Sequence, residues 1–260
     1  MNADTTLYFR DQLREARALA LRDAEAFHEI VFVLERLGGY LCNQDCSVRK
    51  KGKTPPSGLA HKEEHNIKLA EDSPLAIKIP SGFSDLHTSF ETLHRLVREA
   101  RNDAMHEGAF ARHLTVHAIE LSITLEDALM RDCDQISDYM VRNPICCFSW
   151  QPLSFVRQTM LVNSFSYLPV LSGYNDEAVG LISDMALAHY LRQESQLCEK
   201  RLAESLGDLI DSDQIKCCEP KRYKGTALVK DVLKDWDGIP ILVESSSNRL
   251  IGILTPYDLL

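Results

Sequence analysis

Two segments in the second half of this 260-residue chain repeat each other at a spacing of 71 to 72 residues. The first contains Cys146-Cys147, Pro169 and Gly180, and the second contains Cys217-Cys218, Pro240 and Gly252. Cys147 and Pro169 are 22 residues apart, and so are Cys218 and Pro240. A repeat of this fidelity is typical of one structural unit present twice. Because a single short copy could not bury both faces of its own sheet, we expect the two copies to pack as a pseudo-symmetric pair.

The composition is that of an ordinary soluble globular protein. Apolar residues make up 45% of the chain and charged residues 26%, and the length suffices for two domains. The net charge of −9 argues against binding of polyanions by the protein as a whole. The polar N-terminus and the lack of a long apolar run predict a cytoplasmic protein without a membrane partner. The eight cysteines are then expected to be reduced thiols in the core.

From residue 132 onward, short β-prone runs alternate with short helical runs. The pattern predicts strands at 144–147, 167–171, 178–182, 214–218, 239–243 and 249–254. Residues 185–208 are polar with a helical pattern, and they connect the two copies. Each copy therefore has the order strand, helix, strand, strand, helix.

Four short segments give this half a specific resemblance to a known family. They read Tyr-Leu-Pro-Val from 167, Gly-Leu-Ile-Ser from 180, Gly-Ile-Pro-Ile from 238 and Gly-Ile-Leu-Thr-Pro-Tyr-Asp from 252. With them, the chain from about 132 to 260 resembles a tandem pair of CBS (cystathionine β-synthase) domains. In that family the pattern Gly-apolar-apolar-Thr/Ser-x-x-Asp binds the ribose of an adenine nucleotide. The resemblance implies AMP, ATP or a related nucleotide as a regulatory ligand.

Thr255 and Asp258 match that pattern in the second copy. An aspartate can accept two hydrogen bonds from a cis-diol, and both residues lie where a strand turns into a helix N-terminus, which favours an anion. In the first copy Ser183 is in place, but Ala186 holds the acidic position and Asp184 comes two residues early. We therefore expect one nucleotide site, with the binding residues Thr255, Asp258, Ile239, Pro240 and Ser183. The alternative is that Asp258 only caps the last helix and that the pair is a dimerisation module.

The first half of the chain has helical periodicity. Apolar spacing predicts one long helix over 7–38 that ends at Gly38-Gly39. Residues 44–82 contain a basic run and several prolines, which predicts a loop insertion with little helix. Apolar stripes that begin at Leu86 and at Leu114 predict an antiparallel helix pair. Together these elements form an all-α bundle.

The expected junction between those two helices reads Arg101-Asn102-Asp103-Ala104-Met105-His106. The form Arg-Asn-x-x-x-His in this setting resembles the catalytic motif of the HEPN (higher eukaryotes and prokaryotes nucleotide-binding) superfamily. Many members are metal-independent endoribonucleases that act as dimers. The resemblance implies Arg101, Asn102 and His106 as catalytic residues, without a cofactor. A histidine can transfer the protons that RNA cleavage requires, and an arginine can stabilise charge on the phosphoryl oxygens.

Geometry restricts that hypothesis. On one continuous helix, positions i and i+5 lie about 140° apart, so Arg101 and His106 would share a site only at a helix junction or across a two-fold dimer. The alternative is that both are polar residues at a helix end, within a solvated charge cluster that includes Arg98, Asp103 and Glu107.

Cys42, Cys46, His61 and His65 have zinc-ligand spacing, but the intervening segment lacks the aromatic and leucine residues of a zinc finger. A loop with scattered polar residues is the favoured interpretation of this segment. Its basic run, 49–53, could contact an RNA backbone or could simply be solvated. No glycine-rich phosphate loop is present, which argues against ATP hydrolysis.

The sequence thus predicts an α+β multidomain protein, with an all-α HEPN-like bundle over 1–131 and an α/β CBS pair over 132–260. Within the pair, repeat one covers 132–192, the connector 193–208 and repeat two 209–260. The predicted function is a nucleotide-sensing regulator whose helical domain is a metal-independent endoribonuclease, acting as a homodimer on RNA. The alternative is a non-enzymatic regulator in which the bundle is a dimerisation or partner-docking module.

Overall fold

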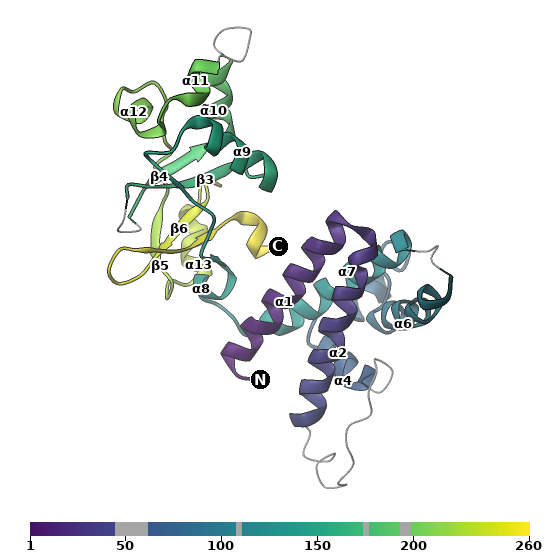
Figure 1. Ribbon diagram of the computed structural model, residues 1–260. Coiled ribbons are helices and arrows are strands. Elements are labelled where there is room, and N and C mark those ends of the chain that lie inside the picture. The colour runs from purple at the N-terminus through teal and green to yellow at the C-terminus, as the bar shows by residue number, and fades with distance from the viewer. Residues whose placement is uncertain (45–61, 108–110, 174–176, 193–198) are drawn as a thin grey trace. The chain divides into compact units, whose positions relative to one another are not determined.

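The computed structural model describes residues 1–44, 62–107, 111–173, 177–192 and 199–260. For residues 100–107 and 111–113 it describes the helical backbone but not the side chains. The chain divides into two compact units, Met1–Cys133 and Asp134–Leu260. The first is helical and the second is an α/β domain, so the predicted fold class is confirmed (Figure 1).

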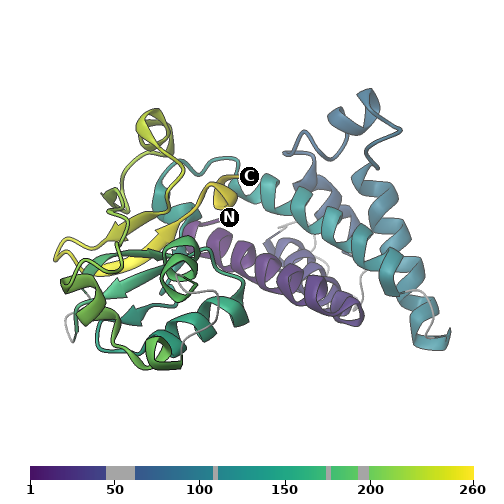
Figure 2. The ribbon, with the colours of Figure 1, turned by 90° about the horizontal axis from the view of Figure 1, so that it is seen from above.

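The first unit begins with α1 (Ala3–Arg22) and α2 (Phe27–Gln44), which pack against each other and against α7 (Ala111–Met130) (Figure 2). The single helix predicted over 7–38 is wrong, because the backbone of Asp23 is extended. The Asp23 carboxylate accepts a hydrogen bond from the Glu25 N–H at 3.0 Å and so starts a 3-10 turn, η1 (Ala24–Ala26), between the helices. The local side-chain cap outweighs the helical periodicity at this point.

Gly38 does not end α2, as the sequence predicted, but allows a neighbouring helix to approach closely. A Cβ atom at Gly38 would lie 2.6 Å from the Lys62 Cβ and 3.1 Å from the Asn66 Oδ1. Asn66 lies on α4 (Glu63–Ala70), is fully buried, and donates its amide N–H to the Leu34 carbonyl at 3.2 Å. The predicted loop insertion over 44–82 therefore contains α4 and α5 (Lys78–Gly82) in its second part, where little helix was expected, while 45–61 lie outside the described residues.

The helices α6 (Phe90–Glu107) and α7 carry the predicted apolar stripes and pack against each other. Their core positions are buried, which confirms the pair: Phe90, Leu93, Val97, Leu114, Ala118, Leu121, Leu125 and Ala128. The predicted start at Leu86 is wrong, since this residue precedes α6 and is 79% exposed. The stripes complete one core with Leu13 of α1 and with Ile30 and Leu34 of α2.

The second unit contains two sheets of similar construction. One has the strand order β2 (Cys147–Phe148), β3 (Tyr167–Leu171), β4 (Ala178–Ser183). The other has the order β1 (Val141–Arg142), β7 (Leu250–Leu254), β6 (Ile241–Glu244), β5 (Arg222–Lys224). In each, a central antiparallel pair, β3–β4 or β6–β7, is extended by a parallel strand, β2 or β5.

Helices cover the outer face of each sheet. The helices α9 (Leu153–Asn163), α10 (Asp184–Leu191) and α12 (Leu206–Asp211) share a core with β2–β4, and α11 (Glu199–Ala203) contacts α9. The helices α8 (Ile136–Tyr139) and α13 (Val229–Val232) share a core with β6 and β7. The turn η3 (Leu233–Asp235) follows α13, and the turn η4 (Pro256–Leu259) follows β7. A further core of Leu171, Ala178, Leu181 and Leu242 joins the two sheets.

Each repeat pairs its leading segment with the sheet of the other repeat. Val141 of β1 pairs with Ile253 of β7. Cys218, at the start of the second repeat, exchanges two backbone hydrogen bonds with Leu181 of β4, at 2.8 and 3.0 Å. Cys218 is therefore the counterpart of Val141 and not of Cys147, which lies in β2. The Cys-Cys match of the repeat is not a structural equivalence, and the strand predicted at 214–218 is wrong.

The cysteines of the described residues are free thiols: Cys42, Cys133, Cys146, Cys147, Cys217 and Cys218. Burial raises the pKa of Cys147 to about 12 and that of Cys217 to about 11, so both stay protonated at neutral pH. Among the described helices, none combines the length and the apolar character needed to cross a membrane.

Candidate functional site

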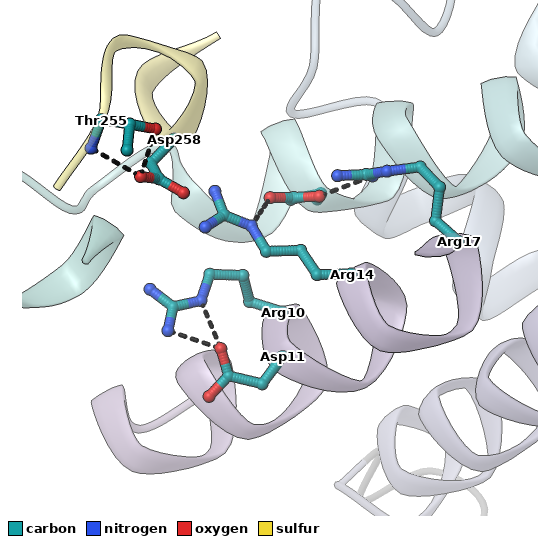
Figure 3. A network of polar contacts seen from close by, with 7 residues as sticks. Arg10, Asp11, Arg14, Arg17, Thr255 and Asp258 are labelled. Carbon is teal, nitrogen blue, oxygen red and sulfur yellow. Dashed lines mark hydrogen bonds and ion pairs between the residues drawn. The ribbon is translucent and has the colours of Figure 1, made fainter. Parts of the chain in front are cut away.

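Thr255 and Asp258 lie at the turn between β7 and η4. Thr255 is the N-cap of η4, and Asp258 is three residues further on. The Asp258 Oδ2 accepts a hydrogen bond from the Thr255 backbone N–H at 2.7 Å and another from the Thr255 hydroxyl at 2.8 Å (Figure 3). Asp258 is only 9% exposed. Burial of a carboxylate is costly unless it is hydrogen-bonded, and these two bonds help to offset that cost.

Ile239 and Pro240 directly precede β6. Because Ile241 pairs with Leu254 in antiparallel register, the residues before β6 and those after β7 lie at the same end of the sheet. The Ile239 N–H donates to the Asp237 carboxylate at 3.1 Å, and the Ile239 carbonyl accepts the indole N–H of Trp236 at 2.6 Å. The fold thus brings Ile239 and Pro240 to the same sheet end as Thr255 and Asp258.

Ser183 occupies the corresponding turn of the other sheet. It ends β4 opposite Tyr167, and its Oγ accepts a hydrogen bond from the Ala186 N–H at 3.1 Å, which caps α10. Ser183 therefore has the capping role of Thr255, while Ala186 supplies no carboxylate. Asp184 is exposed in the first turn of α10. Only the second repeat carries the complete Thr-x-x-Asp arrangement.

The glycines of the two motifs let the crossing segments approach the sheets. A Cβ atom at Gly252 would lie 3.1 Å from the Val141 carbonyl oxygen and 2.3 Å from the Met140 sulfur. One at Gly180 would lie 3.0 Å from the Cys218 carbonyl oxygen. The glycine that opens each motif thus has a packing role at the crossover, separate from any ligand.

The sequence placed Arg101, Asn102 and His106 at a junction between helices, and this is wrong. All three positions lie within α6, which continues to Glu107. Their side chains lie outside the described part of the chain. On a continuous helix, positions 101 and 106 are about 140° apart. One chain therefore does not place Arg101 and His106 on the same helix face.

A polar cluster around the buried His94 of α6, which includes Glu63 of α4, was missed in the sequence. The His94 ring is fully buried, and its Nδ1 lies 3.3 Å from the Glu63 Oε1. Glu63 also forms an ion pair with Arg98. Burial, the largest effect, lowers the pKa of His94, Glu63 raises it and Arg98 lowers it. The signal was present, because His94 adjoins Leu93 and lies four residues after Phe90 on the apolar stripe.

The zinc hypothesis falls largely outside the described residues. Cys46 and His61 are not among them, and neither is the basic run 49–53. Cys42 is buried on α2, and His65 is half-buried on α4. Within the ranges that the structure covers, no group of three or more His, Cys, Asp or Glu side chains could hold a metal ion.

Comparison with known proteins bears on the second unit. Residues 136–193 match the family model described as CBS domain. A crystal structure of a putative acetoin utilization protein (AcuB) from Vibrio cholerae has a TM-score of 0.39 and 18% identity, over 48% of this chain and 86% of that chain. CBSX2, crystallised in complex with AMP, has a TM-score of 0.38 and 20% identity, over 48% and 92% of the two chains.

A third similar structure is CbpB in complex with c-di-AMP, with a TM-score of 0.39 and 20% identity over 48% of this chain and 81% of that chain. A search of curated proteins finds no significant match. The match at 136–193 identifies a CBS domain in the first repeat and does not extend to the helical unit.

Proposed function

We propose that this protein is a nucleotide-responsive regulator whose second repeat binds the ribose of an adenine nucleotide. The observation that carries the proposal is the pairing of Asp258 with Thr255 at the turn after β7, next to Ile239 and Pro240. The CBS-domain match at 136–193 supports the class of protein. Since Ala186 replaces the aspartate in the first repeat, we expect one nucleotide per chain.

The chemistry follows from the hydrogen-bonding capacity of the two side chains. The Asp258 carboxylate would accept hydrogen bonds from the two hydroxyls of the ribose diol, and one of these would replace the hydrogen bond from the Thr255 hydroxyl. The released hydroxyl of Thr255 could then donate to a phosphate oxygen. Because the same bonds start η4, nucleotide binding would alter the order of the last turn. That coupling gives the second unit a means of signalling occupancy.

Ligand-induced thermal stabilisation tests this proposal. AMP or ATP should raise the melting temperature of the wild-type protein, since ligand at 100 times its Kd stabilises the folded state by about 2.7 kcal/mol. Asp258→Ala should lose this shift. Asp231→Ala is the matched control, because Asp231 has a half-exposed carboxylate paired with Lys234 at 2.7 Å. No shift in the wild type, or an equal shift in Asp258→Ala, would overturn the proposal.

For the helical unit we propose metal-independent RNA cleavage by a homodimer. Because Arg101 and His106 are on different faces of α6, the partner copy would complete each site. His106 would take the proton from a 2′-hydroxyl, a second His106 would protonate the leaving 5′-oxygen, and Arg101 would stabilise the phosphorane charge. Asn102 would orient these groups. No cofactor is needed for this chemistry.

The second candidate is a non-enzymatic regulator whose helical unit docks a partner or dimerises. The continuity of α6 through positions 101 and 106 favours it, because one chain alone lacks a shared face. Incubation of the purified protein with labelled RNA in EDTA, with and without AMP or ATP, distinguishes the candidates. The enzyme hypothesis predicts that the wild type cleaves RNA and that His106→Ala abolishes the cleavage. His87→Ala is the control at an exposed histidine, and it should cleave like the wild type. If the wild type does not cleave RNA, the enzyme hypothesis is rejected and the non-enzymatic regulator remains.

A further inference from the structure

The helices α9 and α10 contact each other beside the first sheet (Figure 1). A cavity of about 470 Å³ is lined by residues of these two helices and of the segments that adjoin them. Its apolar lining comes from Met160, Leu161, Phe165, Leu187, Ala188 and Leu191. None of the residues of the proposed nucleotide site lines it. The volume lies within the range of about 300 to 1,000 Å³ that is typical of small-molecule sites.

Large apolar side chains are exposed around this cavity. Leu161 is 63% exposed and Phe165 36%, although both line it. The neighbouring Val162 and Met185 are 70% and 64% exposed. Single exposed apolar side chains are common on protein surfaces, but exposed apolar side chains that line a hollow, as Leu161 and Phe165 do, are typical of a binding surface.

The charges at the cavity are unbalanced. Arg157 of α9 and Arg192 both line it, and within the described residues neither side chain makes a hydrogen bond or an ion pair. Arg192 directly follows the C-terminus of α10, where the helix dipole favours a cation. Arg157 has no comparable stabilisation. Asp184 is the acidic residue among those that line the cavity, and its charge is stabilised in the first turn of α10.

We propose that this cavity binds a small organic anion with an apolar body, such as an alkyl carboxylate. The apolar body would cover Leu161 and Phe165, and the carboxylate would be bound by the guanidinium of Arg157 through charge-assisted hydrogen bonds. The site belongs to the first repeat alone. At the spacing of 71 residues that relates Pro169 to Pro240, the counterpart of Arg157 is Leu228, which has no charge, and that of Phe165 is Trp236.

Competition on the full chain tests this proposal, with the fluorescent aromatic sulfonate 8-anilinonaphthalene-1-sulfonate as the probe. Octanoate should displace the probe, and the uncharged 1-octanol should do so much more weakly. Arg157→Gln should weaken octanoate about tenfold or more, as expected for loss of a charge-assisted bond. It should leave 1-octanol unchanged. Arg142→Gln, at an exposed arginine of β1, is the matched control.

Two further measurements distinguish this cavity from the nucleotide site and from a subunit interface. Octanoate should bind Asp258→Ala as tightly as the wild type, so failure of the nucleotide site leaves this test intact. Equal displacement by octanoate and 1-octanol, or an unchanged octanoate affinity in Arg157→Gln, would overturn the proposal. Sedimentation velocity is the second measurement. If Leu161→Asp dissociates a dimer while octanoate binding is unchanged, the cavity is a subunit interface and the proposal fails.

Discussion

One oxygen of Asp258, Oδ2, accepts two hydrogen bonds from Thr255, at 2.7 Å from the backbone nitrogen and at 2.8 Å from the hydroxyl. These are the two residues that we propose to hold a ribose, and they also start η4. A ligand that engages Asp258 must therefore act on the bonds that define the last turn of the unit. Stability and ligand binding are linked at this one pair.

The first prediction concerns the capping function of this pair. Asp258→Ala should destabilise the second unit by about 0.5 to 2 kcal/mol, because it removes both bonds to Thr255. Thr255→Ser keeps a hydroxyl and should be close to wild type. Both tryptophans, Trp150 and Trp236, lie in the second unit, so their fluorescence in a urea titration reports its unfolding. Equal stability of Asp258→Ala and wild type would show that the cap has no energetic role.

The second prediction concerns the crossover at Gly180. Gly180→Ala should destabilise the second unit by about 1 to 3 kcal/mol through overpacking. The added Cβ would lie 3.0 Å from the Cys218 carbonyl oxygen and 3.1 Å from the Cys217 Cβ, and backbone cannot move aside cheaply. Tryptophan fluorescence again measures the effect. Gly82→Ala in the helical unit is the control, since no atom lies within 4 Å of its new Cβ. It should leave the unfolding of the helical unit, followed by circular dichroism, close to that of the wild type.

The third prediction concerns the pH dependence of the helical unit. The pKa of buried His94 is lowered from 6.5, so the unfolded chain binds a proton at a pH where the folded chain does not. The stability contributed by the neutral His94 is therefore complete above pH 6.5 and falls as the pH drops towards the folded pKa. The slope for one such group is at most about 1.4 kcal/mol per pH unit.

Urea titrations followed by circular dichroism at pH 7.5 and pH 5.5 would measure this slope. His94→Phe should have a weaker pH dependence than the wild type, whatever its stability at pH 7.5. The exposed His87 provides the control, since His87→Gln should keep the wild-type slope. A slope that is the same in His94→Phe and wild type would contradict the assignment.

The fourth prediction compares two ion-paired carboxylates within the helical unit, one nearly buried and one exposed. Glu126 of α7 is 11% exposed and pairs with Arg14 and Arg17 of α1, the second at 2.7 Å (Figure 3). Glu126→Gln should destabilise the unit by about 1 to 3 kcal/mol, because it leaves two half-buried cations with a weaker acceptor. Asp72→Asn removes a pair with Arg131 in which both side chains are at least half exposed. It should change stability by less than about 1 kcal/mol.

Thermal unfolding followed by circular dichroism would compare the two variants. Equal losses in Glu126→Gln and Asp72→Asn would show that burial of the carboxylate does not set the energy of these pairs.

Regular periodicity made parts of the fold predictable. The stripes of α6 and α7, and the strands β3, β4 and β7, follow from apolar spacing that the tertiary structure reinforces. The break at Asp23 was not visible in that spacing, because one side-chain cap ends the helix pattern. Gly38 was misinterpreted as a helix stop because its function depends on Lys62 and Asn66, more than 20 residues away.

The part of the candidate site that is local in sequence was predictable, and the part that depends on tertiary contacts was not. The turn that carries Thr255 and Asp258 is local in sequence, and the structure has it as a strand followed by a capped helical turn. The exchange of leading segments was not predictable, because Cys218 pairs with Leu181 of the other repeat. The matching Cys-Cys dipeptides favoured a false register. The cavity beside Arg157 depends on the packing of α9 against α10, which no single segment encodes.

Calorimetric titration of the full chain with AMP and with ATP tests the central claim most directly. The wild type should bind one of these nucleotides with a stoichiometry of one per chain. Asp258→Ala should show no binding while its tryptophan fluorescence remains that of the folded protein, and Asp231→Ala should bind like the wild type. Absence of binding to both nucleotides by the wild type, or full binding by folded Asp258→Ala, would contradict the assignment of a nucleotide site to the second repeat.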